Sequence, residues 1–261
     1  MIAHSPNQQF YETAEVVERF SEGNLLFKAE EVILSSLRGE FKDKPLLEIG
    51  IGAGRVTPLL RDLSKDYIGA DSSQRMIDLC KQKFGDGAFL ACDARHMPIF
   101  QNKQFAAVFF CWNGIDEVSA SDRMLILEEI YRVLKKDGVF VFSSHNLDWE
   151  AIPSYSFSGF SRSGAAFEVL RDGVLCLRAY ASALSARLRS RVSRRGYAVI
   201  QEYEEPPGIL VPRLFISKEA QVRQLLDAGF NQVEAWAGEG APLDDENRGR
   251  DHLVYYVARK P

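Results

Sequence analysis

The alternation of short apolar runs with helical segments constrains this chain more than any other feature. LLEIG (46–50) is followed by a glycine cluster and the helical VTPLLRDL, and YIGAD then precedes the helical SQRMIDLCKQKF. AFLACD, FAAVFFCW and GVFVFSSH are three further strand candidates. FAAVFFCW is continuously apolar, as expected for a strand buried on both faces. Strands that alternate with helices predict a parallel, doubly wound α/β sheet.

The length of 261 residues suits a single α/β domain that carries an insertion. Helical spacing of apolar residues predicts N-terminal helices in 1–43, and the sheet core is expected at 44–148. The alternation stops at 149–212, which we interpret as a mainly helical lid inserted over the carboxyl edge of the sheet. Residues 213–261 supply a helix and two alternating runs typical of an antiparallel pair at a sheet edge. We therefore expect a Rossmann-like sheet of seven strands with an antiparallel edge strand.

Composition excludes several classes of protein. The net charge of −4 gives no general attraction to nucleic acid. The four cysteines lie far apart without a C-x-x-C pair, and the four histidines form no close ligand cluster, so neither a disulfide framework nor a metal site is expected. The N-terminus has no signal-peptide pattern, and no run of eighteen apolar residues occurs, so we expect no membrane span and a cytoplasmic location.

The first strand-to-helix turn, GIGAG, has the composition of a ligand-binding loop. Gly50, Gly52 and Gly54 lack a Cβ, which lets the backbone turn sharply and approach a ligand closely, although a purely structural turn is the alternative. Asp71 ends the second strand, where a carboxylate can accept the ribose hydroxyls of an adenosine. The dinucleotide fingerprint G-x-G-x-x-G is broken, because Arg55 stands where its third glycine would fall.

These residues resemble the class I S-adenosylmethionine-dependent methyltransferases, particularly the small-molecule, type 11-like group. The acidic-x-G-x-G-x-G motif of that family is matched by Glu48 with the three glycines, and its ribose acid by Asp71. The acid that receives the adenine amino group is matched by Asp93, followed by Ala94, in CDARHMPI. The helix-to-strand signature is matched by EEIYRVLKKDGVFVFS. The resemblance implies S-adenosylmethionine as cofactor and S-adenosylhomocysteine as product.

The resemblance also implies further cofactor contacts. Trp112 and Asn113, at the end of the fourth strand, would lie beside the methionine part of the cofactor, and Tyr11 would reach its carboxylate. Glu48 is suited to hold the cationic amino group through a water or the loop backbone. We also place Arg55 and Ser72 in this site. Met76 would pack near the ribose or adenine, with simple core packing as the alternative.

Methyl transfer is an in-line displacement, so the main task of such an enzyme is to align acceptor, methyl and sulfur and to exclude water. A general base is needed only when the acceptor arrives protonated. His145, just after the fifth strand, is the best-placed candidate, and a hydrogen-bonded loop histidine is the alternative reading. Asp116 and Glu117, after the fourth strand, are further candidates, although either could simply begin the next helix.

The sequence limits the possible classes of acceptor mainly through motifs that it lacks. CWNGID stands where amino-group methyltransferases acting on bases carry an Asn/Asp-Pro-Pro-aromatic turn, and Cys111 follows Phe110 rather than a proline. Both features argue against nucleic-acid bases as acceptors. The insertion holds several arginines at helical spacing, either a solvated face or a lid for a carboxylate or phosphate: Arg171, Arg178, Arg187, Arg189, Arg191, Arg194 and Arg195. Its aromatic residues either wall an apolar pocket or form a small core of their own: Trp149, Tyr155, Phe157, Phe160, Tyr197 and Tyr203.

The sequence thus predicts an enzyme that transfers a methyl group from S-adenosylmethionine to an O, N or C atom of a small anionic or aromatic acceptor. The protein would be a monomer or homodimer without nucleic-acid or membrane partners. Two alternatives stay open. One is an NAD-dependent oxidoreductase on the same kind of sheet, and the other is a regulator that binds S-adenosylmethionine without catalysis.

Overall fold

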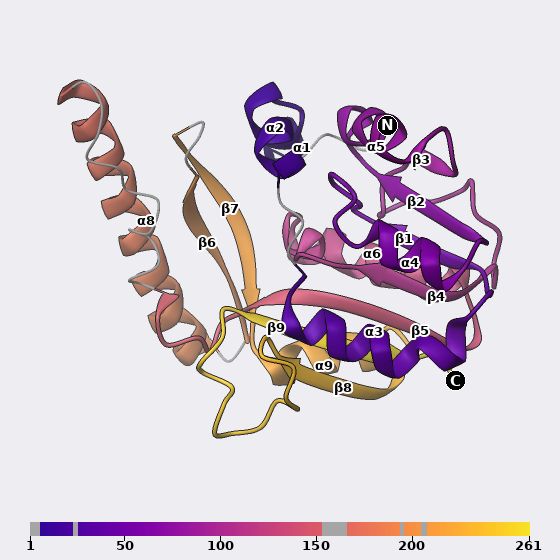
Figure 1. Ribbon diagram of the computed structural model, residues 1–261. Helices are drawn as coiled ribbons and strands as arrows, with labels where there is room; N and C mark the ends of the chain where they lie inside the picture. The colour runs from indigo at the N-terminus through magenta and orange to yellow at the C-terminus, as the bar shows by residue number, and fades with distance from the viewer. Residues whose placement is uncertain (1–5, 23–25, 153–165, 194–195, 205–207) are drawn as a thin grey trace.

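The structure is a computed structural model, and it describes residues 6–22, 26–152, 166–193, 196–204 and 208–261. The described chain forms one twisted sheet with helices on both faces and a long helix at one side (Figure 1). Nine strands of the described chain belong to the sheet. They are β1 (Leu46–Ile49), β2 (Tyr67–Asp71), β3 (Phe89–Ala91), β4 (Phe105–Phe110), β5 (Leu134–Asn146), β6 (Tyr197–Glu204), β7 (Ile209–Ile216), β8 (Asn231–Ala237) and β9 (Leu253–Arg259).

The parallel part of the sheet has the strand order β3-β2-β1-β4-β5. β9 pairs antiparallel with β5, and β8 pairs antiparallel with β9, so the expected antiparallel pairing of the last two strands is confirmed. The doubly wound, mostly parallel architecture is confirmed as well. The antiparallel strand itself is not at the edge, because β9 lies between β5 and β8.

The sheet has nine strands rather than the expected seven because the hairpin β6–β7 joins it. β7 pairs in parallel with β5 at His145 and Asn146. Residues 139–142 of β5 pair with β4 on one edge and β9 on the other, and His145 still pairs with β9. β7 therefore pairs with the same edge of β5 as β4 does, at positions beyond the end of β4. Pro212, where we expected the insertion to end, lies inside β7.

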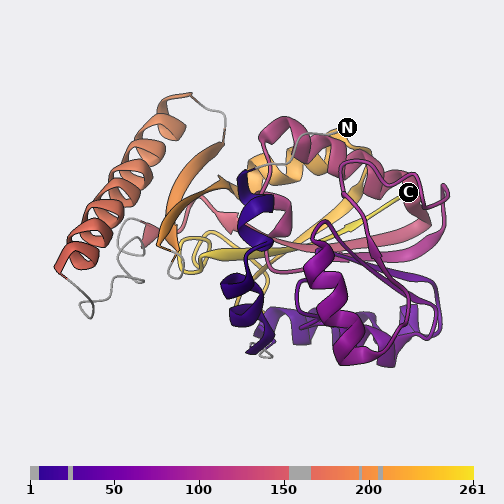
Figure 2. The same ribbon diagram turned by 90° about the horizontal axis from the view of Figure 1, so that it is seen from above.

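The helices cover the two faces of the sheet. Buried side chains of α3, α4 and α5 cluster on one face, and those of α6 and α9 cluster on the other (Figure 2). Ser73, Ser119 and Ser217 begin α5, α6 and α9, each accepting a hydrogen bond from the backbone nitrogen three residues on. The helices are α1 (Pro6–Tyr11), α2 (Ala14–Glu22), α3 (Lys28–Phe41), α4 (Thr57–Leu63), α5 (Gln74–Phe84), α6 (Ala120–Val133), α8 (Ala166–Ser193) and α9 (Lys218–Asp227), with the 3-10 helix η1 (Gly114–Asp116).

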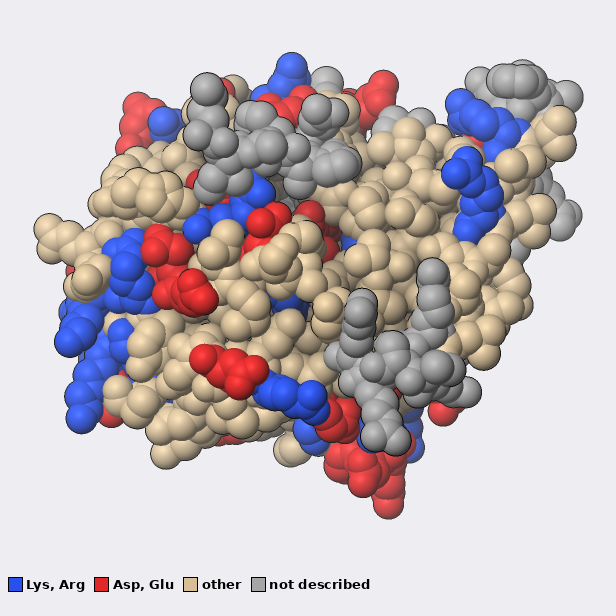
Figure 3. Space-filling view, turned by 180° about the vertical axis from the view of Figure 1, so that it is seen from behind, with Lys and Arg blue, Asp and Glu red and all other residues tan. Residues whose placement is uncertain are grey.

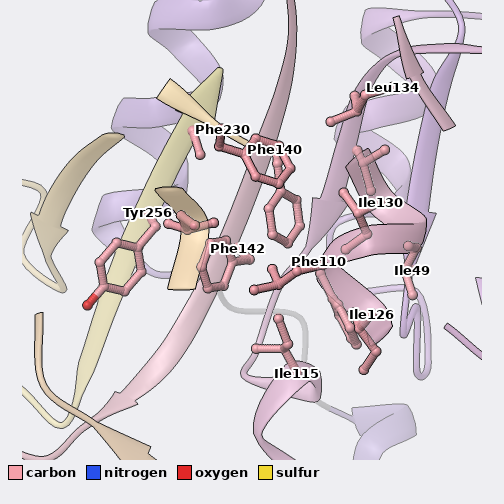
Figure 4. Close-up of a cluster of buried hydrophobic side chains, with 14 of the residues drawn as sticks. Ile49, Phe110, Ile115, Ile126, Ile130, Leu134, Phe140, Phe142, Phe230 and Tyr256 are labelled. Atoms are coloured by element: carbon pink, nitrogen blue, oxygen red, sulfur yellow. The ribbon is translucent and has the colours of Figure 1, made fainter. Parts of the chain in front are cut away.

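The centre of the sheet is densely packed. Every residue of β4 is buried, as its continuous apolar run predicts. Phe140 and Phe142 of β5 stack with their ring centroids 4.4 Å apart, and Phe142 also stacks on Tyr256 of β9 (Figure 4). Burying a side chain of this kind stabilises a fold by about 1.5–3 kcal/mol. The centre of the sheet is therefore a rigid support for the loops at its carboxyl edge.

The helix α8 lies at the side of the molecule, against the hairpin (Figure 1). Its buried apolar positions among the described residues are small, namely Cys176, Ala179, Ala183 and Ala186. Two of the insertion's arginines, Arg171 and Arg178, are exposed. The side chains of the others lie outside the described residues: Arg187, Arg189, Arg191, Arg194 and Arg195. No helix in the described part of the chain combines the length and apolar character needed to cross a membrane.

The aromatic residues of the insertion divide in a similar way. Trp149 packs against a small cluster that includes Leu147 and Ile152, and Tyr203 packs with Cys176. Tyr197 packs beside the buried end of β7. The aromatic side chains at positions 155, 157 and 160 lie outside the described residues. The described aromatic side chains of the insertion therefore pack in small hydrophobic clusters, as one of the two sequence interpretations expected.

Candidate functional site

A cavity of about 460 Å³ opens at the carboxyl ends of β1, β2, β4 and β5. This edge of a parallel sheet is where ligands of doubly wound proteins bind. Among the site residues predicted from the sequence, Gly54 and Asp116 do not line the cavity. The predicted residues that do line it are Tyr11, Glu48, Gly50, Gly52, Arg55, Asp71, Ser72, Met76, Asp93, Ala94, Trp112, Asn113 and His145.

The glycine turn has three residues in the left-handed region, with φ of +62° at Gly50, +52° at Gly52 and +79° at Gly54. A Cβ at Gly50 or Gly54 would collide with the ring of Phe110 or Phe84, at 2.5 and 2.4 Å. A Cβ at Gly52 would meet no protein atom within 4 Å. Gly54 therefore serves the packing of the turn, whereas the open side of Gly52 leaves room for a ligand to approach the backbone.

Asp71 connects the glycine turn to the end of β2. One carboxylate oxygen accepts from the backbone nitrogen of Gly52 at 2.9 Å, and the other accepts from that of Ser73 at 2.8 Å. Burial raises the pKa of Asp71, and these backbone hydrogen bonds act in the opposite direction. Because each oxygen has two lone pairs, the carboxylate retains the capacity to accept from a ligand.

Asp93 is held in place by an ion pair. Nη2 of Arg95 lies 2.6 Å from Oδ2 of Asp93, and the backbone nitrogen of Arg95 donates to Oδ1 at 2.9 Å. Arg95, in the loop after β3, also forms an ion pair with Asp122 of α6 at 3.3 Å. The carboxylate of Asp93 is thus oriented before any ligand arrives.

Glu48 is buried beneath the turn. Its Oε2 accepts from the hydroxyls of Thr57 at 2.8 Å and Tyr67 at 2.5 Å. Burial raises the pKa of Glu48 to about 7, although these two hydrogen bonds oppose the shift. A cationic group beside this carboxylate would favour its charged form.

Arg55 joins the turn to α3. Its guanidinium makes a bidentate ion pair with the buried carboxylate of Glu30, and it lies over the rings of Phe27 at 5.3 Å and Trp112 at 4.9 Å. Trp112 and Asn113 both have φ near +57°. Such a backbone conformation is unfavourable for a bulky residue and occurs most often at functional sites. It turns the chain sharply where β4 ends at the cavity.

His145 and Asp116, which the sequence offered as separate candidates, form a hydrogen-bonded pair. Asp116 Oδ2 lies 2.8 Å from His145 Nδ1 and also accepts from the His145 backbone nitrogen at 2.6 Å. Asp116 is fully buried and forms an ion pair with Arg123. His145 lies inside β5 rather than after it, because pairing with β7 and β9 prolongs the strand.

The protonation of this pair follows from its surroundings. Burial alone would raise the pKa of Asp116, but the Arg123 guanidinium and the bond to His145 lower it. Burial alone would lower the pKa of His145, but the hydrogen bond to Asp116 and its charge raise it above the ordinary value. With Nδ1 held by Asp116, Nε2 is the ring nitrogen on the other side of the imidazole, and it lies at hydrogen-bond distance, 3.4 Å, from the Asn113 amide nitrogen.

The other end of the cavity is lined by charged residues that sequence reasoning largely missed. Arg213 of β7 donates to Glu117 at 2.8 Å and to Glu202 of β6 at 2.7 Å, and it also binds Glu204. The Tyr11 hydroxyl donates to Glu117 at 3.0 Å. Tyr11 therefore contacts this cluster, and its contact with the cofactor carboxylate stays a prediction. Asn7, Arg19 and His252 complete this end of the cavity.

Two signals in the sequence indicate part of this cluster. Arg213 is a lone charge inside the apolar run ILVPRLFI, and Glu202 and Glu204 occupy alternate positions of YAVIQEYE. Charges at buried strand positions are rare unless they are paired. No local pattern marks Asn7 or His252.

The described residues offer no cluster of metal ligands, and the face seen in Figure 3 offers no continuous basic surface for nucleic acid. No group of three or more His, Cys, Asp or Glu side chains among the described residues is arranged to hold a metal ion. On the face seen in Figure 3, basic and acidic side chains occur in small neighbouring groups. That mixture does not form the continuous basic surface that nucleic-acid binding uses.

Comparison with known proteins finds a family match that includes the glycine turn. Residues 47–142 match the family model described as a methyltransferase domain. The malonyl-[acyl-carrier protein] O-methyltransferase of Hamiltonella defensa subsp. Acyrthosiphon pisum is 27% identical over 111 residues, 42% of this chain and 42% of that relative. The demethylmenaquinone methyltransferase of Thermotoga maritima is 31% identical over 104 residues, 39% of this chain and 44% of that relative. The chain therefore matches less than half the length of these relatives.

A solved structure extends the likeness in fold to the whole chain. The glycopeptide N-methyltransferase MtfA, complexed with S-adenosyl-L-homocysteine, has a TM-score of 0.56 and 17% identity, over 99% of both chains. The strand order, the glycine turn and the family match agree with the resemblance found in the sequence. Residues 47–142 therefore match a methyltransferase-domain family, and the chain shares its fold with a solved methyltransferase.

Proposed function

We propose that the chain is a S-adenosylmethionine-dependent methyltransferase that methylates an O, N or C atom of a small-molecule acceptor. One observation carries the proposal: the glycine turn of the methyltransferase domain and the His145–Asp116 pair meet at a single cavity. Its volume of about 460 Å³ is that of a small-molecule site.

The residues of the turn fit the cofactor. Gly52 leaves its backbone open to the cavity, Asp71 and Asp93 offer oriented acceptors for ribose hydroxyls and an adenine amino group, and Glu48 offers a carboxylate to the cationic amino group. When bound, the cofactor supplies an electrophilic methyl carbon: the acceptor's bond to that carbon forms as the carbon–sulfur bond breaks, and the sulfur keeps the electron pair. The leaving group consequently needs no proton.

His145 is the proposed general base. Asp116 fixes the ring through Nδ1, so that Nε2 can take a proton from an acceptor hydroxyl or ammonium. Asp116 is a positioning residue here, because it is fully buried behind the imidazole and does not reach the cavity. The main task of the protein remains to orient the acceptor and exclude water.

The relatives do not identify the acceptor. One is named for malonyl-[acyl-carrier protein] and another for demethylmenaquinone, and the family model ends at residue 142, before α8, β6 and β7. We infer that segments outside the matched domain contribute to the choice of acceptor.

Calorimetry separates the proposal from its alternatives. We expect S-adenosylhomocysteine to bind the purified protein and NAD to show no heat of binding. The opposite result would establish the dehydrogenase alternative, which the match of the glycine turn to a methyltransferase model disfavours. Incubation with methyl-labelled S-adenosylmethionine and a pooled small-molecule extract should then label a compound, and His145→Ala should abolish most of that label. Cofactor binding without any labelled product would indicate the regulator.

A further inference from the structure

The hairpin β6–β7 brings an unusual excess of acceptor groups to the cavity. Its register pairs Ile200 with Arg213 and Glu202 with Val211, so Glu202, Glu204 and Arg213 lie on one face of the hairpin. All three of these charged residues line the cavity. They lie beyond the end of β4 and beside His145, a residue of β5 that pairs directly with β7.

The charges at this end do not balance. Three carboxylates, Glu117, Glu202 and Glu204, surround the buried guanidinium of Arg213. Arg19 adds a second cation, bound to Glu204 at 3.0 Å, but its side chain is partly exposed. With His145 and His252 neutral, the three negative and two positive groups of this cluster among the described residues leave a formal charge of −1. Asp116 does not alter this balance, because the buried Arg123 neutralises it.

Among the three carboxylates, one oxygen is available to a ligand. Glu117 uses both oxygens, toward Tyr11 and Arg213 on one and toward Asn7 on the other. Glu204 also uses both, toward Arg213 and Arg19. Glu202 uses only one oxygen: its Oε2 accepts from Arg213 at 2.7 Å, and its Oε1 has no hydrogen-bond partner among the described residues.

A second, independent group at this end also needs a donor. The amide nitrogen of Asn7 donates to the backbone oxygens of Glu117 and Pro212 and to the Glu117 carboxylate, at 2.7–3.1 Å. The orientation of the amide is therefore fixed, since a flip would set its oxygen against three acceptors. Its Oδ1 is buried and has no hydrogen-bond partner among the described residues. A buried carbonyl without a donor is unfavourable unless a ligand or water supplies one.

These acceptors select the chemistry of the ligand. An ammonium group has three donors, no acceptor and one positive charge. A carboxylate or phosphate would bring only acceptors and a further negative charge to a region that already holds an excess of both. The geometry points to an alkyl amine as the methyl acceptor, with its ammonium received by Glu202 near Asn7 and its proton passed to Nε2 of His145.

This inference rests on the proposed methyltransferase function and adds the acceptor class. An ammonium has no lone pair, so it must lose one proton before nitrogen can form the new bond to carbon. His145 receives that proton and becomes an imidazolium, while the carbon–sulfur bond breaks and sulfur retains its electrons. The arginines of the insertion left an anionic acceptor open, but Arg171 and Arg178, the two described side chains among them, do not line the cavity.

Small probes test the inference without knowledge of the natural acceptor. The protein saturated with S-adenosylhomocysteine is titrated with methylammonium, methanol and acetate, which are small enough for any part of the cavity. The ring signals of His145 are followed by nuclear magnetic resonance. We expect a saturable shift with methylammonium, at least tenfold tighter than with either other probe. Equal or tighter binding of acetate would overturn the inference.

A charge-removing variant locates the binding group. Glu202→Gln keeps an oxygen for Arg213 and removes the negative charge, so methylammonium affinity should fall at least tenfold while S-adenosylhomocysteine affinity stays unchanged. Glu234→Gln, the same change on exposed β8, serves as the matched control. Unchanged methylammonium binding in Glu202→Gln would overturn the role of Glu202. Failure of wild-type protein to bind S-adenosylhomocysteine would instead refute the proposed function, so the two failures are distinguishable.

Discussion

The two ends of the cavity are built by different means. The end that we propose for the cofactor uses backbone at one glycine turn and carboxylates at the ends of neighbouring strands, all within the segment 47–142 that matches the family model. The end that we propose for the acceptor uses side chains from α1, from the loop after β4 and from the hairpin β6–β7, which lie up to about two hundred residues apart. The first end is built from the matched domain, and the second depends on long-range contacts that also involve segments outside it.

This contrast predicts that variants at the two ends will fail in different ways. At the cofactor end, Gly52→Val should have the largest effect, lowering S-adenosylhomocysteine affinity at least about 100-fold, because the new side chain would occupy the space open to the ligand. Calorimetry measures the affinity. Gly85→Val, at an exposed and equally open position whose φ is +84°, imposes the same kind of backbone strain and should bind normally. Normal affinity in Gly52→Val would contradict the location of the cofactor.

At the acceptor end, His145→Ala should lower turnover by about 10²-fold or more, the usual contribution of a general base. Its affinity for S-adenosylhomocysteine should change less than threefold, since the ring belongs to the other end of the cavity. Steady-state assays and calorimetry on the same preparation separate the two quantities. A parallel loss of turnover and cofactor affinity would remove the distinction between the ends.

Asp116→Asn should have a smaller effect on turnover, about tenfold, because the imidazole remains present but is less well oriented. Asp116 raises the pKa of His145, so its neutralisation should move the acidic limb of the kcat/KM profile to lower pH. A structural role alone would lower activity without moving that limb. Thermal unfolding is measured in parallel, because Arg123 loses its buried partner and a loss of stability is expected.

The smallest expected effect is the release of a fraction of a proton from Glu48 when S-adenosylhomocysteine binds. Burial raises the pKa of Glu48 to about 7, so the carboxyl is largely protonated near pH 6.5, and a cationic amino group beside it should release that proton. Calorimetry of S-adenosylhomocysteine binding in buffers of different ionisation enthalpy measures the release. Glu48→Gln should abolish the buffer dependence. Dependence that persists in this variant would assign the proton to another group.

The raised pKa of Glu48 also determines whether the ligand-free protein gains or loses stability as the pH rises. Between pH 4.5 and about 7 the folded protein retains the Glu48 proton that the unfolded chain has released. The ligand-free protein should therefore lose stability as the pH rises through this window, and Glu48→Gln should flatten that part of the profile.

Much of the cofactor end was predictable because its determinants are local. A glycine turn after a strand, and Asp71 at the end of the next strand, are visible in a single stretch of sequence. Parallel strands carry their ends to the same edge, so these residues had to meet. The predicted ligand contacts of Asp71, Asp93 and Tyr11 nevertheless remain predictions, because the structure shows which protein groups these side chains bind and does not contain the ligand.

The sequence by itself determined the doubly wound sheet, the order of its motifs and the glycine turn, because these depend on periodicity and on residues close together in the chain. Only the tertiary structure decided that Asp116 lies under His145, that the hairpin continues the edge of β5 beyond β4, and that Asn7 reaches Glu117. Strand register and the docking of distant segments fix those contacts, and neither leaves a local pattern in the sequence. The part of the protein that would choose its acceptor is for that reason the part that the sequence alone could not describe.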